Sequence, residues 1–146
     1  MVVAVGAPSP WRREVPGEPA AFRPAAGEVA AAAVGLGAPA RREDDLVLAV
    51  HELLVNAWEH GHRGALDPPI RVEVARDLDG AVTVRVADAA RGGRWHPDAL
   101  PAIGDPGGGR GRGLAIVRAL AGEVTVTAGE DGTAVTLTLP RGGAAC

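Results

Sequence analysis

Two pairs of alternating segments, each divided by an Asp-Gly dipeptide, constrain the fold of this chain more than any other feature. In both pairs apolar and polar residues alternate on either side of the dipeptide: Ile70 to Arg76 and Ala81 to Val86 around Asp79-Gly80, then Val124 to Ala128 and Ala134 to Leu139 around Asp131-Gly132. Such alternation is typical of half-buried strands, and Asp-Gly is a frequent hairpin turn. The sequence therefore predicts two β-hairpins that lie far apart along the chain.

Helices are expected before each hairpin. The first runs from about Ala25 to Leu36 and stops at a Gly/Pro segment. The second follows the acidic residues 43–45, whose charge favours a helix N-terminus, and continues at helical spacing to Gly61. A third covers Leu114 to Ala121. Hairpins separated by helices predict a two-layer α/β sandwich, a mixed and mostly antiparallel sheet with helices on one face.

The remaining segments set the expected domain organisation and surroundings. Residues 1–24 form a Pro- and Ala-rich leader with room for a short strand at 11–15, residues 25–140 form one domain, and 141–146 form a flexible tail. The net charge is -3 without a basic block, so nucleic acid is not an expected partner. No apolar run is long enough to span a membrane, and the single cysteine forms no internal disulfide, so a cytoplasmic protein is expected.

Missing residue types exclude several enzyme classes. All 15 basic residues are arginine, whereas P-loop proteins and ordinary protein kinases need a lysine at the phosphates. Ser9 is the only serine and lies in the leader, which argues against a serine-nucleophile hydrolase. Asn56 is the only asparagine.

The second expected helix carries a polar stripe of Glu52, Asn56 and His60, spaced four residues apart. An asparagine oxygen is a hard ligand suited to Mg²⁺. A glutamate one turn away can accept a proton from an attacking hydroxyl or water. The alternative is a surface helix with scattered polar residues.

Two further motifs suit a nucleotide. Asp88 follows an apolar strand, where its carboxylate can accept a hydrogen bond from the adenine amine; a turn-forming aspartate is the alternative. The segment Gly107 to Gly113 leads directly into the third helix, so its backbone N–H groups and the helix dipole favour an anion. Arg110 and Arg112 add positive charge, and a simple surface loop is the alternative reading.

In this order the motifs resemble the nucleotide site of the GHKL superfamily, the ATP-binding fold of gyrase, histidine kinases and MutL. The matches are Glu52-x-x-x-Asn56-Ala57 to the N-box, Asp88-x-x-x-Gly92 to the G1 box, Gly111-x-Gly113-Leu114 to the G2 box, and Gly132-Thr133 to the final Gly-Thr. The resemblance covers residues 28–140 and implies the Bergerat ATP-binding fold.

This resemblance also implies a role for each matched residue, with ATP and Mg²⁺ as cofactors. Glu52 is implied as the general base and Asn56 as the Mg²⁺ ligand. The remaining nucleotide-binding residues are Asp88 and Thr133 at adenine, Gly92 beside it, and Gly111, Arg112, Gly113 and Leu114 at the phosphates. One departure stands at Ala90, where the family usually has glycine. The extra methyl is expected to crowd the adenine loop, so weaker nucleotide binding than is usual for the family is expected.

The short chain, with Asn56-Ala57-x-x-His60-Gly61 and the Gly111-Arg112-Gly113-Leu114 turn, looks like the anti-sigma-factor serine/threonine kinases. The implied partners are a sigma factor, an anti-anti-sigma protein of the STAS type, and a second copy of the chain in a homodimer. A non-catalytic ATP-binding module and a stand-alone histidine-kinase-like ATPase domain are the alternatives. A metal-dependent hydrolase is a weaker one, and it would use four histidines: His51, His60, His62 and His96.

Overall fold

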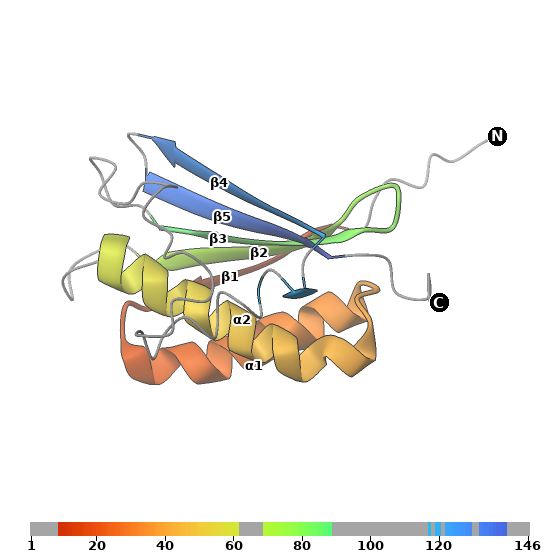
Figure 1. Ribbon diagram of the computed structural model, residues 1–146. Helices are drawn as coiled ribbons and strands as arrows, with labels where there is room; N and C mark the ends of the chain where they lie inside the picture. Colours follow the sequence, from red (N-terminus) through yellow and green to blue (C-terminus); the bar gives the residue numbers. More distant parts are fainter. Residues whose placement is uncertain are drawn as a thin grey trace.

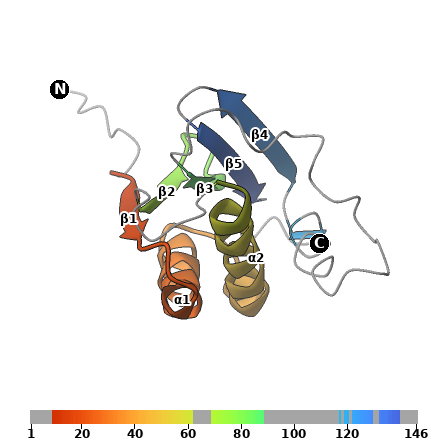
Figure 2. The same cartoon turned by 90° about the vertical axis from the view of Figure 1, so that its left-hand side faces the viewer.

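The protein is a two-layer sandwich of one sheet and two long helices in a computed structural model, which describes residues 9–61, 69–88, 117, 119–120, 122–129 and 132–139. The helices cover one face of the five-stranded sheet, and within the described residues its other face carries no element (Figures 1 and 2). The predicted two-layer architecture is confirmed. The tail 141–146 lies outside the described residues.

The sheet joins both predicted hairpins edge to edge. Its strands are β1 (Trp11–Val15), β2 (Ile70–Arg76), β3 (Val82–Ala87), β4 (Glu123–Gly129) and β5 (Gly132–Leu139). Their order is β1-β2-β3-β5-β4, and every neighbouring pair is antiparallel. The second hairpin therefore attaches to the first through β5, which places the start of β5 beside the end of β3.

The first hairpin turn is closed by an aspartate side chain. Asp77 Oδ1 accepts the backbone N–H groups of Asp79 at 2.9 Å and of Ala81 at 3.0 Å. Gly80 has a φ of 87°, a conformation that favours glycine. Because the turn uses Ala81, the strand begins at Val82 instead of the predicted Ala81.

The first helix is longer than predicted. Helix α1 spans Pro19–Gly35, so the predicted start at Ala25 is wrong. Pro19 lies in the first turn, where its missing N–H has no intrahelical partner in any case. Pro24 lies inside the helix and removes one hydrogen bond, a local cost that burial of Phe22 and Ala25 offsets. The prolines in this segment therefore led to a predicted helix start that was too late in the sequence.

The second helix changes type near its end. After a 3₁₀ turn, η1 (Ala40–Arg42), helix α2 runs over Glu43–Asn56 with its acidic residues in the first turn, as predicted. It then continues as a π-helical turn, η2 (Ala57–Gly61), so the regular α-helix ends earlier than the predicted Gly61. Single π-helical turns are rare and occur frequently at functional sites.

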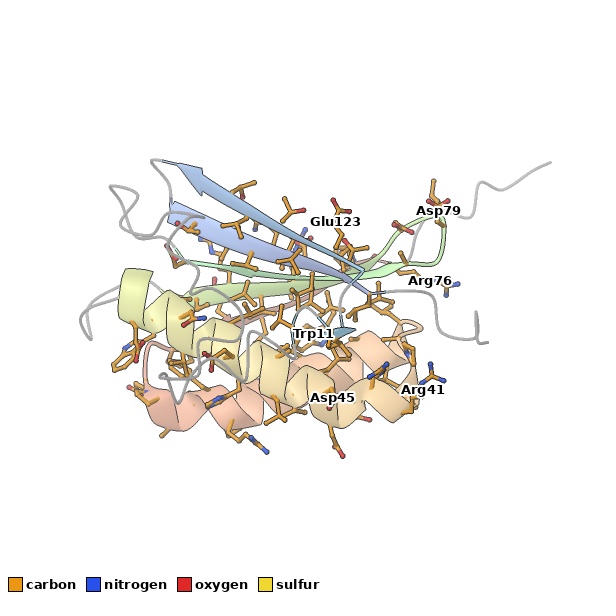
Figure 3. All side chains as sticks on the ribbon, viewed as in Figure 1. Trp11, Arg41, Asp45, Arg76, Asp79 and Glu123 are labelled. Atoms are coloured by element: carbon orange, nitrogen blue, oxygen red, sulfur yellow. The ribbon has the colours of Figure 1, made fainter. Side chains whose placement is uncertain are left out.

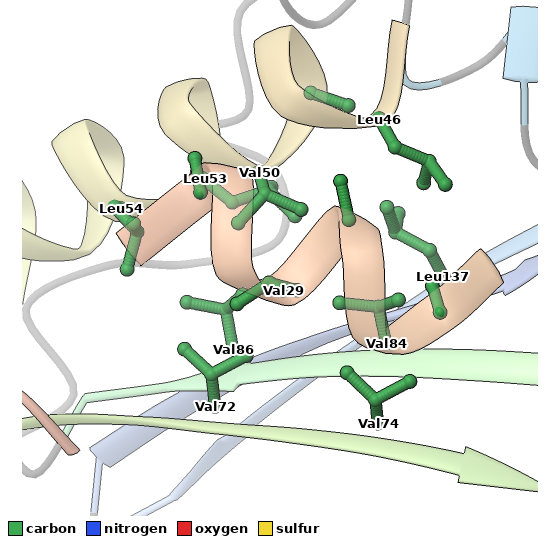
Figure 4. Packing of buried hydrophobic residues seen from close by; sticks show 14 of the residues in the cluster. Val29, Leu46, Val50, Leu53, Leu54, Val72, Val74, Val84, Val86 and Leu137 are labelled. Carbon is green, nitrogen blue, oxygen red and sulfur yellow. The ribbon is translucent and has the colours of Figure 1, made fainter. Parts of the chain in front are cut away.

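The core lies between the helices and the inner face of the sheet (Figure 4). Alanines along α1 allow close approach to α2, while branched side chains from both helices meet valines of β2 and β3. Fully burying each Val or Leu stabilises the fold by about 1.5–3 kcal/mol. The labelled members are Val29, Leu46, Val50, Leu53, Leu54, Val72, Val74, Val84, Val86 and Leu137.

The predicted third helix is described only in part. Val117, Ala119 and Leu120 are helical, and the side chains of Val117 and Leu120 join the core. The rest of Leu114 to Ala121 lies outside the described residues. Among the helices that are described, none is long and apolar enough to cross a membrane.

Candidate nucleotide site

Three chain segments that carry predicted site residues meet at one end of the molecule. The end of α2, the end of β3 and the start of β5 all lie at the left-hand end of Figure 1. The π-helical turn η2 contacts β5 directly. The antiparallel pairing of β3 with β5 fixes this arrangement, because the end of one strand then faces the beginning of the other.

Glu52 and Asn56 lie one turn apart on α2, as the sequence predicted. Asn56 is only 5% exposed, and its Nδ2 atom is buried with no hydrogen-bond partner among the described residues. A buried amide donor without an acceptor costs free energy, and such groups in native proteins commonly contact a ligand, ion or water. The Asn56 amide therefore fits the binding of a polar group at this position.

The π-helical turn is anchored on the helix layer by Trp58. Its ring meets the ring of Phe22 on α1 edge to face, with centroids 6.2 Å apart and an interplanar angle of 67°. A side chain at Gly17 would lie 3.6 Å from Trp58 Cδ1. Trp58 thus ties the residues just after Asn56 to α1, a contact that was not predicted from the sequence.

Asp88 and Thr133 are joined by two hydrogen bonds. The Asp88 N–H donates to the Thr133 carbonyl oxygen at 2.9 Å, which extends the ladder between β3 and β5 by one pair. The Thr133 N–H donates to Asp88 Oδ1 at 3.2 Å. Both residues are buried, at 7% and 4% exposure. The structure therefore brings together the two residues predicted at adenine and fixes the orientation of the carboxylate.

Gly132 makes this close pairing sterically feasible. Its φ is 121°, and a Cβ atom there would lie 2.2 Å from the Asp88 carbonyl oxygen and 3.0 Å from Asp88 Oδ1. No side chain fits at those distances. The motif match and the predicted Asp131-Gly132 turn both included Gly132, but this contact between distant segments was not predicted.

His51, next to Glu52 on α2, occupies a different electrostatic environment. Partial burial and then the positive charge of Arg23 lower its pKa below the usual 6.5. In the described part of the chain no group of three or more His, Cys, Asp or Glu residues is arranged to hold a metal ion. The hydrolase alternative therefore gains no support there; His62 and His96 lie outside the described residues, and so does the side-chain position of His60.

A family model, the histidine kinase-like ATPase domain, matches residues 15–139. The chain belongs to this family. The sequence-based resemblance to the GHKL superfamily is thereby confirmed, and ATP binding is the activity that membership in a family of ATPase domains implies. The matched range includes β1 and all of α1, so it starts earlier than the motifs alone indicated.

Several solved structures share the fold of this ATPase domain. The RsbU and RsbW domains of Rv1364c from Mycobacterium tuberculosis align at 27% identity and TM-score 0.65, over 91% of this chain and 32% of that one. The ATPase domain thus spans about a third of the length of that chain.

Two further structures share the fold at lower identity. SiaB in the SiaB–SiaC complex from Pseudomonas aeruginosa aligns at 14% identity and TM-score 0.62, over 88% of each chain. The histidine kinase domain of the blue-light activated histidine kinase from Erythrobacter litoralis EL346 aligns at 23% identity and TM-score 0.57, over 82% of this chain and 61% of that one. At these identities the likeness concerns the fold alone.

The phosphate side of the ATPase domain lies outside the described residues. This applies to Gly92, Gly111, Arg112, Gly113 and Leu114, and to Ala90 at the departure from the family pattern. Their assigned roles stay predictions. The described part of the predicted site is therefore the pair Asp88–Thr133, predicted to bind adenine, and the α2 pair Glu52–Asn56.

Proposed function

We propose that this ATPase domain is an anti-sigma-type serine/threonine kinase that phosphorylates an anti-anti-sigma protein of the STAS type and sequesters a sigma factor. The observation that carries the proposal is the buried Asn56 amide, one helical turn from Glu52 and at the same end of the molecule as Asp88–Thr133. The 27% identity to the chain with RsbU and RsbW domains supports a regulatory role in bacteria.

Adenine selection follows from the chemistry of Asp88. An ionised carboxylate only accepts hydrogen bonds, so it favours the exocyclic amine of adenine and disfavours guanine, which presents a carbonyl oxygen at the corresponding position. The Thr133 N–H orients this carboxylate through the bond to Oδ1. ATP is therefore expected to bind more tightly than GTP.

Asn56 suits a magnesium ion that accompanies the nucleotide. Its side-chain oxygen is the kind of neutral, hard ligand that Mg²⁺ accepts in small number alongside phosphate oxygens. When bound, the ion neutralises charge on the phosphates. The Nδ2 donor of the same amide is then available to a phosphate oxygen or a water molecule, which satisfies the group that is buried without a partner in the described residues.

In the proposed phosphotransfer, Glu52 accepts the proton of the attacking hydroxyl group. The partner's seryl or threonyl oxygen forms a bond to the γ-phosphorus while the bond from that phosphorus to the β–γ bridging oxygen breaks. The electron pair of the broken bond leaves with ADP, and the hydroxyl proton moves to the Glu52 carboxylate. The i, i+4 spacing on α2 keeps this base one turn from Asn56.

The decisive test compares Glu52→Gln with Glu43→Gln, a change of the same chemistry on the first turn of the same helix. Calorimetry measures ATP affinity, and single-turnover assays measure phosphate transfer to a cognate anti-anti-sigma protein. We expect Glu52→Gln to bind ATP like the parent but to transfer phosphate at least ~10²-fold more slowly, the lower end for general base catalysis.

Two results would count against the proposal in different ways. If Glu52→Gln transfers phosphate at the parental rate, Glu52 is not the base, although the protein is still a kinase. A parent that binds both ATP and the partner yet transfers no phosphate would instead be a non-catalytic module. Phosphate found on histidine in place of serine or threonine would identify a histidine-kinase-like domain.

A further inference from the structure

The outer face of the sheet carries charges in an alternating grid. One row runs across the strands from Arg12 on β1 to Glu73 on β2 and Arg85 on β3. Its charges are positive, negative and positive. In the next row along the strands, Glu14 lies opposite Arg71, so the order of the charges from β1 to β2 is reversed. Both rows point away from the helices, because the residues between them on β2 and β3 are buried valines.

This grid surrounds a hollow of about 440 Å³. Its lining contains four arginines and two glutamates, an excess of positive charge on a chain whose net charge is -3. Arg12 is paired with Glu73 at 2.8 Å, and Arg13 is paired with Glu28 of α1 at 2.9 Å. Among the described residues, Arg71 and Arg85 form no ion pair. Two planar, exposed guanidinium groups thus remain for an external anion.

The register shows where the grid is incomplete. On β3, the residue opposite Arg71 is Ala87, at the position where the alternation would place a negative charge. The methyl group of Ala87 leaves space between Arg71 and Arg85 that a carboxylate from outside can occupy. Arginine binds carboxylates through paired N–H donors, so this corner matches an aspartate or glutamate side chain.

We propose that the grid over Arg12, Glu14, Arg71, Glu73 and Arg85 is a docking surface for an acidic segment of a protein partner. The interleaved Glu14 and Glu73 repel a continuous polyanion, which disfavours nucleic acid. The grid has more arginines than glutamates, so two copies of this face cannot pair every arginine with a glutamate, which disfavours a second copy. A protein segment with separated carboxylates matches both signs of the grid.

The docking surface is separate from the nucleotide residues. It occupies the outer face over β1 to β3, whereas Glu52 and Asn56 belong to α2 on the helix-covered side (Figures 1 and 2). A partner held there would leave the α2 residues uncovered. The proposal therefore stands whether or not the domain transfers phosphate.

The test uses a labelled peptide of three Glu-Gln repeats as the probe, because its carboxylates are separated, with hexaglutamine as the neutral control. Fluorescence anisotropy gives the affinity, and amide chemical shifts of the isotopically labelled protein give the location. The test variant is Arg71→Gln/Arg85→Gln. The charge-matched control is Arg41→Gln/Arg42→Gln, since Arg41 lies at the helix layer, away from the outer face (Figure 3).

We expect the Glu-Gln peptide to shift the amide signals of the outward residues of β1, β2 and β3, and hexaglutamine to shift none. The Arg71/Arg85 variant should bind at least about tenfold more weakly, from the loss of charge-assisted hydrogen bonds, while the Arg41/Arg42 variant should bind within about twofold of the parent. ATP affinity of both variants, measured alongside, should match the parent and shows that they are folded.

Four outcomes would overturn the proposal. These are no binding of the Glu-Gln peptide at millimolar concentration, equal weakening in both double variants, tighter binding of a hexathymidylate strand to the same residues, and self-association of the protein through this face in sedimentation. Equal weakening of binding in both double variants would mean that the peptide is held by long-range attraction and not at a site. The last two outcomes would assign the face to nucleic acid or to a second copy of the chain.

Discussion

Replacing Gly132 with alanine separates two roles of this glycine, its backbone conformation and its contact with Asp88. A Cβ at residue 132 would lie 2.2 Å from the Asp88 carbonyl oxygen, so the end of β3 and the start of β5 must move apart. The movement breaks the bond from the Thr133 N–H to Asp88 Oδ1, which is worth about 1.5–3 kcal/mol because the acceptor is charged. The unfavourable φ adds about 1–3 kcal/mol.

Gly37→Ala is the matched control. Gly37 has a φ of 123°, close to the 121° of Gly132, but the nearest atom to its added Cβ is Val82 Cγ2 at 4.0 Å, an ordinary contact. Both substitutions remove the same chain freedom from the unfolded state, so that effect cancels in the comparison. The difference between the two variants therefore measures the contact with Asp88.

We expect Gly132→Ala to lose about 2 kcal/mol more unfolding free energy than Gly37→Ala in urea titrations followed by circular dichroism. ATP affinity by calorimetry should fall at least about tenfold in Gly132→Ala, equivalent to about 1.4 kcal/mol, and remain parental in Gly37→Ala. Equal losses of stability in the two variants, with parental ATP affinity in Gly132→Ala, would refute the reasoning.

Four further changes give distinct expected results. Asn56→Leu removes the buried donor, so the nucleotide-free protein should melt at the same or a higher temperature while Mg²⁺-dependent ATP affinity is lost; a lower melting temperature would contradict this. Asp88→Asn adds a donor facing the adenine amine, and calorimetry should show weaker ATP binding with an unchanged circular dichroism spectrum. Gly113→Val should lose ATP and ADP together, because bulk blocks backbone approach to phosphate, and retained ADP binding would exclude this loop. Because burial and Arg23 lower the folded-state pKa of His51, the free energy of unfolding should decrease as pH falls from the unfolded value of 6.5 toward the lower folded pKa. Arg23→Gln should raise the pKa of His51 measured by NMR, and an unchanged pKa would mean that the charge of Arg23 does not contribute to the shift.

The sequence allowed prediction wherever local chemistry decides the structure. The Asp79-Gly80 turn and the strand alternation predicted the hairpins, because turn residues and the period of two act over short distances. The acidic first turn of α2 was likewise readable. The motif spacing also placed Glu52 and Asn56 one turn apart on the same helix.

Features that depend on distant segments were missed. The start of α1 depends on the burial of Phe22 beneath the sheet and beside Trp58, which outweighs the helix-breaking tendency of Pro24. The change from α to π geometry after Asn56 has no known local signal in the sequence. The steric need for Gly132 arises only when β5 lies beside β3, so no property of residues 130–134 alone reveals it.

The pairing of β3 with β5 also has a consequence for how the chain acquires activity during synthesis. Asp88 and Thr133 lie 45 residues apart in sequence, and forming their contact requires closing the whole intervening loop. Elements β1, α1, α2, β2 and β3 all precede Asp88, so they emerge from the ribosome well before their partner strand. We therefore expect a ribosome-bound chain to acquire adenine recognition only after β5 has left the exit tunnel and added itself to β3. ATP retention by nascent chains would then report completion of the sheet, the slow and non-local step in this topology.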